Sequence, residues 1–192
     1  MAKLPDPMRL FAGIAIPPEV QQSLRRLIDA LRGAAPSLRW SRPENLHITT
    51  KFLGEVPEAS LERMIETLGA LPRVGRIAIG IRGLGWFPNP HSPRVFWCGV
   101  DAPPELAQLA RLTEEAVAPF GIERENRKFS PHLTLARVNP GTPVLKLQQA
   151  VAALPSVEFG NFTAFHFHLY ESQLAPGGSK YRKLATFPLE AA

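Results

Sequence analysis

Cysteine is nearly absent from the sequence. Cys98 is the only one in 192 residues, so an intrachain disulfide is impossible. This excludes the disulfide-stabilised secreted scaffolds and fits a reducing cytoplasm, where we expect the protein to reside. Because Cys98 lies between Trp97 and Gly99 in an apolar run, we interpret it as a small buried side chain rather than a nucleophile.

Long apolar runs are missing as well. No stretch approaches the roughly 20 apolar residues that a membrane-spanning helix needs. The N-terminal segment contains no long apolar core followed by a cleavage site, so we expect neither a signal peptide nor contact with a membrane.

The rest of the composition is that of an ordinary globular protein, with 45% apolar and 20% charged residues. Its 20 prolines are scattered between apolar runs and indicate turns and helix starts rather than a disordered tract. The net charge of +5 favours an anionic partner, of which nucleic acid is the commonest, although it also suits plain solubility.

The most informative feature is an internal repeat. Residues 9–20 resemble residues 94–106, and His47-Ile48-Thr49 recurs 85 residues later as His132-Leu133-Thr134. We therefore expect one bilobed domain over residues 1–192, with repeats at about 9–93 and 94–192. A pseudo-twofold axis would place the two histidines across a cleft. Because the duplication supplies both halves of such a site, we expect a monomer.

The apolar pattern of each half predicts strand, helix, strand, helix, strand, which gives an α+β fold. In the first half these elements are expected at residues 10–16, 17–32, 47–53, 58–71 and 76–83. In the second half they are expected at residues 95–100, 105–117, 132–138, 144–153 and 159–169, followed by a last strand at 182–187.

The two His-x-Thr motifs suit phosphodiester chemistry. Side chains alternate along a strand, so His47 and Thr49 share one face, and so do His132 and Thr134. Opening a cyclic phosphate needs a base to activate water and an acid to protonate the leaving oxygen. Imidazole titrates near pH 6.5, so one histidine can serve as each, while the threonine hydroxyls bind the phosphate oxygens. This scheme requires no metal.

The motifs are unlikely to recur by chance. Random placement of the histidines and threonines would give about 0.2 His-x-Thr matches in this chain, and two occur at equivalent positions of the repeat. A single such histidine is most often an ordinary strand residue. The pair at repeat-equivalent positions indicates a function.

At these motifs the sequence resembles the 2H phosphoesterase superfamily. Within it, the sequence is similar to the RNA 2′,3′-cyclic phosphodiesterases, historically called 2′-5′ RNA ligases. The matching segments are residues 9–11, 42–54, 131–137 and 170–181, which span almost the whole chain.

The resemblance implies a bilobal α+β fold in which two antiparallel sheets, flanked by helices, enclose a central cleft. It implies that 2′,3′-cyclic phosphate RNA ends, or cyclic nucleotides, are hydrolysed to a 2′-phosphate without a metal or cofactor. His47 would be the proton donor and His132 the proton acceptor, with Thr49 and Thr134 binding the phosphate. Weak reversible 2′-5′ RNA ligation is implied as a side activity.

Four further residues are candidates for substrate contact. By alternation Lys51 shares the His47 face, where it reaches the cleft edge or is simply solvated. Ser130 shares the His132 face and stands where relatives often carry a basic residue. Alternation puts Arg137 on the face opposite His132, which favours strand support with an electrostatic role. Tyr170 precedes the loop at residues 176–178, which shapes one rim of the cleft or is an ordinary hairpin.

Three residues outside this group are given structural interpretations. Phe52 is expected in the core beside Ile48, rather than serving as a platform for a base. His166 and His168 share a strand face and could bind a metal, but neither a carboxylate nor a cysteine lies beside them in a recognised ligand spacing.

Three alternatives to the main hypothesis stay open. The same catalytic pair could act on another cyclic phosphate, such as ADP-ribose 1″,2″-cyclic phosphate, or on linear RNA ends. The chain could hold RNA ends without turnover, although paired imidazoles are not what a pure binder needs. It could instead be a metal hydrolase that uses His166 and His168.

Overall fold

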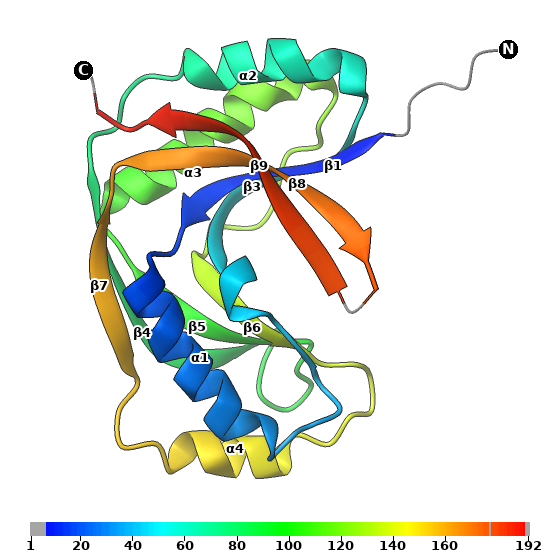
Figure 1. Cartoon of the computed structure of the whole chain (residues 1–192), viewed down its shortest axis with the longest axis vertical. Coiled ribbons are helices and arrows are strands. Elements are labelled where there is room, and N and C mark those ends of the chain that lie inside the picture. The colour runs from blue at the N-terminus through cyan, green and yellow to red at the C-terminus, as the bar shows by residue number, and fades with distance from the viewer. Residues whose placement is uncertain (1–6, 177, 191–192) are drawn as a thin grey trace, which may run out of the picture.

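The computed structural model describes residues 7–176 and 178–190. These residues form an α+β fold with two antiparallel sheets, which confirms the predicted class (Figure 1). The strands are β1 (Met8–Ala15), β2 (Arg39–Trp40), β3 (His47–Val56), β4 (Ile77–Phe87), β5 (Val95–Asp101), β6 (His132–Arg137), β7 (Glu158–Ala164), β8 (His166–Ala175) and β9 (Gly178–Pro188). The helices are α1 (Pro18–Arg32), α2 (Leu61–Gly69), α3 (Pro104–Val117) and α4 (Leu145–Ala152), with short 3-10 turns η1 (Pro43–Asn45), η2 (Glu58–Ser60) and η3 (Ala118–Phe120).

Each sheet combines strands from both halves of the chain. One sheet has the order β3-β1-β8-β9 and the other β2-β6-β5-β4-β7. Strand β4 follows β1 and β3 in the chain but pairs with β5, while β8 and β9 come last and pair beside β1. The halves therefore exchange strands, so neither sheet corresponds to one repeat. The repeat boundary near residue 93 stays a prediction.

The prediction of a single strand at residues 159–169 is wrong. The chain leaves the five-stranded sheet after Ala164 and enters the four-stranded sheet at His166. At the break, the Phe165 carbonyl accepts a hydrogen bond from the Leu189 amide, and the Phe165 side chain is exposed. Neither glycine nor proline marks this position, so the sequence carries no signal for the change of sheet.

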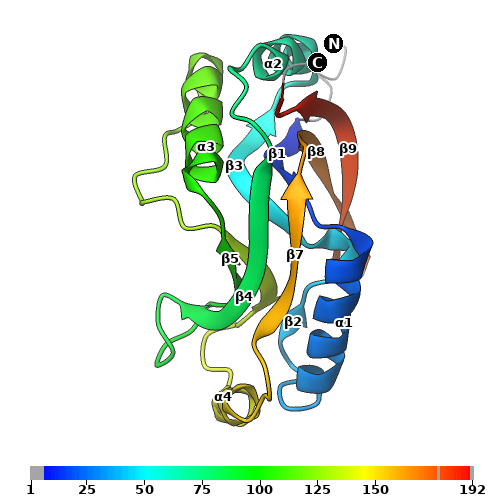
Figure 2. The same ribbon diagram turned by 90° about the vertical axis from the view of Figure 1, so that its left-hand side faces the viewer.

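The helices cover the sheets on the sides away from the histidine motifs. Helices α2 and α3 pack on the four-stranded sheet, whereas α1 and α4 lie against the five-stranded one (Figure 1). Figure 2 shows α1 and α3 on opposite sides of β4 and β7. Helix α1 begins with Pro18 at its first turn and buries an apolar stripe that includes Val20, Leu24 and Leu31.

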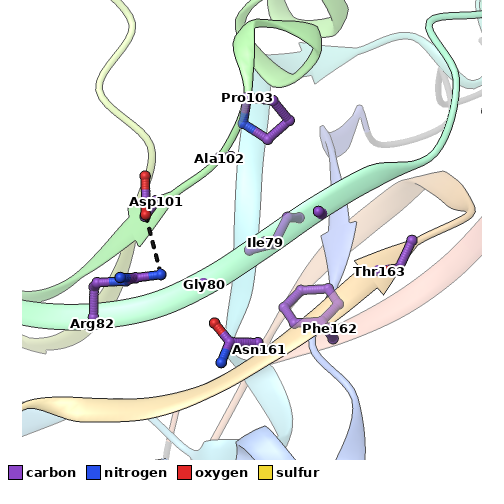
Figure 3. A pocket seen from close by; sticks show the side chains of 10 residues that line it. Ile79, Gly80, Arg82, Asp101, Ala102, Pro103, Asn161, Phe162 and Thr163 are labelled. Atoms are coloured by element: carbon purple, nitrogen blue, oxygen red, sulfur yellow. Dashed lines mark ion pairs between the residues drawn. The ribbon is translucent and has the colours of Figure 1, made fainter.

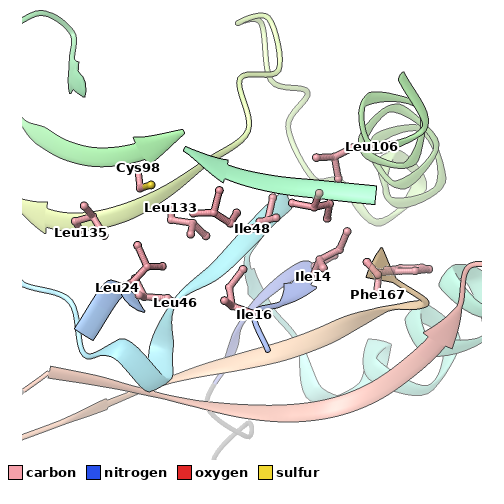
Figure 4. Packing of buried hydrophobic residues seen from close by; sticks show 14 of the residues in the cluster. Ile14, Ile16, Leu24, Leu46, Ile48, Cys98, Leu106, Leu133, Leu135 and Phe167 are labelled. Carbon is pink, nitrogen blue, oxygen red and sulfur yellow. The ribbon is translucent and has the colours of Figure 1, made fainter. Parts of the chain in front are cut away.

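A continuous apolar core joins the two sheets. Figure 4 shows Leu24 of α1 beside Leu135 and Cys98, and Ile14 and Ile48 of the other sheet in the same cluster. All five side chains are at most 1% exposed. The core therefore fixes the two sheets relative to each other, and with them the strands that carry the histidines.

A β-bulge interrupts the alternation of each histidine strand. In β3, Thr49 pairs with Gly13 and Lys51 with Ala12, which leaves Thr50 as the extra residue. In β6 the extra residue is Leu135, which lies 85 positions after Thr50. Because a bulge puts one additional residue into a strand, each side chain beyond it points to the face opposite to the one that simple alternation predicts.

The bulge in β3 turns Lys51 away from the cleft. Lys51 is 7% exposed, and its Nζ donates to Glu114 Oε1 at 2.8 Å and to the Glu123 carbonyl at 2.6 Å. Glu114 belongs to α3, on the covered side of the sheet. The prediction that Lys51 shares the His47 face is therefore wrong, because its side chain instead ties α3 and the segment after it to β3.

Removing the Lys51 ammonium should destabilise the fold. In Lys51→Met the half-buried Glu114 carboxylate, 22% exposed, keeps only the Glu125 amide as a donor. We expect the free energy of unfolding in urea to fall by about 1–3 kcal/mol, because a buried carboxylate loses its cation. Arg111→Met, which breaks the exposed Arg111–Glu115 pair on the same helix, is the control and should change it by under about 0.5 kcal/mol. Equal effects of the two substitutions would contradict a structural role for Lys51.

Candidate active site

Both His-x-Thr motifs stand at the start of a strand. His47 begins β3 and His132 begins β6, and in both strands the threonine follows on the same face. The intervening Ile48 and Leu133 are 0% exposed and belong to the core, as predicted. The imidazole of His132 lies near enough to His47 to affect its titration. The structure thus brings together the two motifs that the repeat relates.

A backbone carbonyl orients each imidazole. His47 Nδ1 lies 2.7 Å from the Asn45 carbonyl oxygen, and His132 Nδ1 lies 2.8 Å from that of Ser130. Because a carbonyl oxygen only accepts, each Nδ1 carries the hydrogen and donates it. This leaves Nε2 of both rings for the reaction. The main chain of Ser130 thus positions His132, while contact between its exposed side chain and substrate stays a prediction.

Aromatic rings enclose His47. Phe11 stacks on its imidazole at a centroid distance of 4.4 Å, and Tyr181 meets it edge-on at 5.1 Å. This burial lowers the pKa of His47 to about 4, although the hydrogen bond to Asn45 raises it, and the charge of His132 lowers it further. His47 is therefore neutral at neutral pH in the unliganded protein.

His132 is partly exposed and has a different neighbourhood. Phe87 approaches its ring edge-on at 5.0 Å, and Trp97 lies beside Phe87 at 5.0 Å. Trp97 is also the cross-strand partner of Thr134, so the aromatic pair and the second motif share one face of the sheet.

Tyr170 supports the His47 ring through Phe11. Its ring stacks on Phe11 at 5.0 Å, it is 9% exposed, and burial raises its pKa to about 12. Together with Tyr181 and His47 it lines a pocket of about 90 Å³. Direct contact between Tyr170 and substrate stays a prediction.

Strands β8 and β9 flank the loop at residues 176–178 and pair antiparallel as far as Ala175 and Gly178. Gly177 lies outside the described residues, so a role of the loop in the cleft rim stays a prediction. The side-chain Nδ2 of Asn45 donates to the Ser179 carbonyl at 2.7 Å, which attaches the turn before His47 to the start of β9.

The bulges also correct two predictions about the cleft face. Phe52, expected in the core, is 63% exposed and pairs with Phe11 on the His47 face. Arg137, expected opposite His132, pairs with Val95 and shares the face of Thr134. Both predictions are wrong because they assumed unbroken alternation past residues 50 and 135. The extra residues are threonine and leucine, so composition gave no sign of a bulge.

Sequence reasoning also missed Phe11 as a site residue. Strand β1 is apolar on both faces, since Leu10, Ala12 and Ile14 enter the core while Phe11 faces the cleft. A strand without polar alternation does not reveal which face is functional. Only the pairing with β3 identifies the outward face.

Of the remaining titratable candidates, Cys98 lies in the core, whereas His168 lies across β1 from Thr49, since both are cross-strand partners of Gly13. Cys98 is 0% exposed and burial raises its thiol pKa to about 12, which confirms that it is a buried small side chain. His168 Nδ1 lies 3.0 Å from the Thr186 hydroxyl, and His166 is 6.5 Å away between ring centroids. Within residues 7–176 and 178–190, no cluster of three or more His, Cys, Asp or Glu side chains could hold a metal ion. None of the described helices is long and apolar enough to cross a membrane.

A wider groove of about 500 Å³ lies over β4, β7 and the end of β5 (Figure 3). Arg82 and Asp101 form an ion pair at 3.2 Å along it, and Asn161 and Thr163 add polar groups. Its lining contains no histidine and none of the residues predicted from the sequence. It therefore lacks an acid-base pair of the kind formed by His47 and His132.

Comparison with known proteins agrees with this geometry. The family described as LigT like Phosphoesterase matches residues 14–97 and 100–181. An RNA 2′,3′-cyclic phosphodiesterase of Archaeoglobus fulgidus is 36% identical over 94% of this chain and 99% of its own length. One of Methanothermobacter thermautotrophicus is 33% identical over 95% of this chain and 99% of its own.

Solved structures show the same fold. E. coli LigT complexed with 3′-AMP has a TM-score of 0.79 and 27% identity, covering 97% of this chain and all 100% of its own. TT0787 of Thermus thermophilus has a TM-score of 0.78 and 30% identity, covering 95% of this chain and 98% of its own. With matching sequence, fold and paired motifs, the chain belongs to the LigT-like phosphoesterase family.

Proposed function

We propose that the protein is an enzyme that hydrolyses 2′,3′-cyclic phosphates at RNA ends to 2′-phosphates without a metal. The observation that carries the proposal is the matched orientation of His47 and His132, each with Nδ1 bound to a carbonyl and Nε2 available. The names of the relatives, RNA 2′,3′-cyclic phosphodiesterases, support the same substrate class.

In the proposed reaction the two histidines transfer protons in opposite directions. His132 Nε2 accepts a proton from water as the water oxygen attacks phosphorus. The bond from phosphorus to the 3′ oxygen breaks, and His47 Nε2–H donates its proton to that oxygen. Thr49 and Thr134 donate hydrogen bonds to the non-bridging oxygens. The products are a 2′-phosphate and a free 3′ hydroxyl, and proton exchange with water resets both rings.

The donor role of His47 depends on the substrate. Burial lowers its pKa to about 4, so few unliganded molecules carry the proton at neutral pH. An anionic phosphate beside the ring favours the charged imidazolium and raises its pKa in the complex. Substrate binding and protonation of His47 are thus coupled.

A variant of the same step would produce the expected 2′-5′ RNA ligation. If an RNA 5′ hydroxyl replaces water as the nucleophile, the same bond to the 3′ oxygen breaks and a 2′-5′ linkage forms. Because both halves of the chain contribute a histidine, residues 1–192 act as one domain and a monomer suffices. Another cyclic phosphate, such as ADP-ribose 1″,2″-cyclic phosphate, would use the same pair and stays the alternative substrate.

Replacing either histidine should abolish most of the activity. We expect His47→Ala and His132→Ala each to lower kcat for a cyclic-ended RNA by at least about 100-fold, since each removes a proton-transfer group. Excess EDTA should leave the unmodified protein active, and the product should be the 2′-phosphate. His166→Ala, an exposed histidine outside the pair, is the control. Inhibition by EDTA would contradict the metal-independent mechanism, and a 3′-phosphate product would reverse the leaving-group assignment.

The pH dependence should reveal the donor. Because His132 must be neutral in the same step, the titration of His47 is read from the ratio of kcat/KM in the unmodified protein to kcat/KM in His47→Gln. If His47 must be protonated, this ratio should fall as pH rises above the free-enzyme pKa of about 4. The corresponding ratio for kcat should fall only at higher pH, because bound phosphate raises that pKa. A ratio that instead rises with pH through this range would make His47 the base.

A further inference from the structure

An exposed aromatic ring extends the cleft face beyond His47. Phe52 is 63% exposed, although its cross-strand partner Phe11 is only 3% exposed. Their ring centroids are 6.3 Å apart, so Phe11 supports one side of the Phe52 ring while the other side stays open. Leaving so much of a phenylalanine in water gives up most of the free energy that its burial would gain. A ring held in this way offers a surface for stacking.

An exposed arginine shares the face of this ring. Arg9 lies two residues before Phe11 on the same side of β1, next to the strand that carries Phe52. Within the part of the chain that the structure describes, it forms no ion pair with a carboxylate, although Glu55 is its cross-strand partner. Arg137 lies on the other side of the histidine pair, because β2 pairs with the end of β6 and leads from there to His47. We call Phe52 and Arg9 the outer platform.

The outer platform lies one step beyond the reacting phosphate. Phe52 follows His47 by five positions of β3, one of which is taken up by the bulge. The Phe11 ring lies 4.4 Å from that of His47 and 6.3 Å from that of Phe52, so the Phe52 ring lies within about 11 Å of the imidazole. An RNA chain leaving the catalytic pair along β3 reaches the outer platform after its terminal nucleotide. Aromatic rings with flanking cations are the usual combination for binding single-stranded nucleic acid.

We propose that the outer platform binds the nucleotide on the 5′ side of the cyclic-phosphate residue. Its base stacks on Phe52, and the phosphate that joins it to the terminal nucleotide lies beside Arg9. This inference rests on the proposed function, and it assigns an oligonucleotide rather than a cyclic mononucleotide as the preferred substrate. Stacking and charge contacts of this kind discriminate little between bases.

The test compares substrates with and without that nucleotide. We would measure kcat/KM for a cyclic mononucleotide and for a trinucleotide with a cyclic end. Phe52→Ala should lower the value for the trinucleotide by about tenfold or more, because the stacking surface is lost. It should change the value for the mononucleotide less than about twofold, and Phe52→Trp should restore the trinucleotide rate. Phe165→Ala is the matched control, since Phe165 is also exposed, at 49%, but lies between β7 and β8.

Arg9 is tested by salt dependence. Arg9→Gln should weaken binding of the trinucleotide and reduce the slope of its affinity against salt concentration, because one phosphate contact is lost. The cyclic mononucleotide should show neither change. Fluorescence anisotropy with a labelled trinucleotide that ends in the 2′-phosphate product measures this binding without turnover.

Three results would overturn the outer platform. The first is an equal loss of kcat/KM on both substrates in Phe52→Ala, and the second is no loss of kcat/KM on either substrate. The third is no preference of the unmodified protein for the trinucleotide. Failure of the proposed function looks different. If the protein hydrolysed neither substrate but bound the product trinucleotide in a way that Phe52→Ala weakened, the catalytic proposal would fail and the outer platform would stand.

Discussion

The β-bulges at Thr50 and Leu135 determine which side chains face the cleft. Before each bulge a histidine and a threonine face the cleft, and beyond the bulge the alternation of the two faces is reversed. On one side this sends Lys51 into the ion pair with Glu114 that attaches α3. On the other it brings Phe52 and Arg137 onto the catalytic face. A regular strand would bury an aromatic ring and leave a lysine in the cleft.

Burial fixes the orientation of the His47 ring but disfavours its charged form. Phe11 and Tyr181 hold the ring, and the Asn45 carbonyl fixes its tautomer. The same enclosure disfavours the imidazolium, which lowers the pKa. An anionic substrate offsets that cost only when it occupies the site. The arrangement thus links the charge state of the proposed donor to the presence of phosphate.

The apolar core joins the two sheets, and the described residues contain neither a disulfide nor a metal-ligand cluster that would do so. Strand β4 pairs in the sheet of His132, and β8 pairs in the sheet of His47. Because each sheet contains strands from both halves, neither half can unfold without disrupting both sheets. Separating the two motifs would open the shared core around Ile48 and Leu133.

The sequence by itself determined the α+β class, most element positions, the family and the four motif residues, because each depends on local pattern or on the repeat. It predicted Ile48 and Leu133 in the core for the same reason. Only the tertiary structure decided the faces of Lys51, Phe52 and Arg137, since a bulge is defined by the partner strand. The break at Phe165 and the enclosure of His47 by Phe11 were also decided there. Both arise from pairing between segments far apart in the chain, which local sequence does not encode.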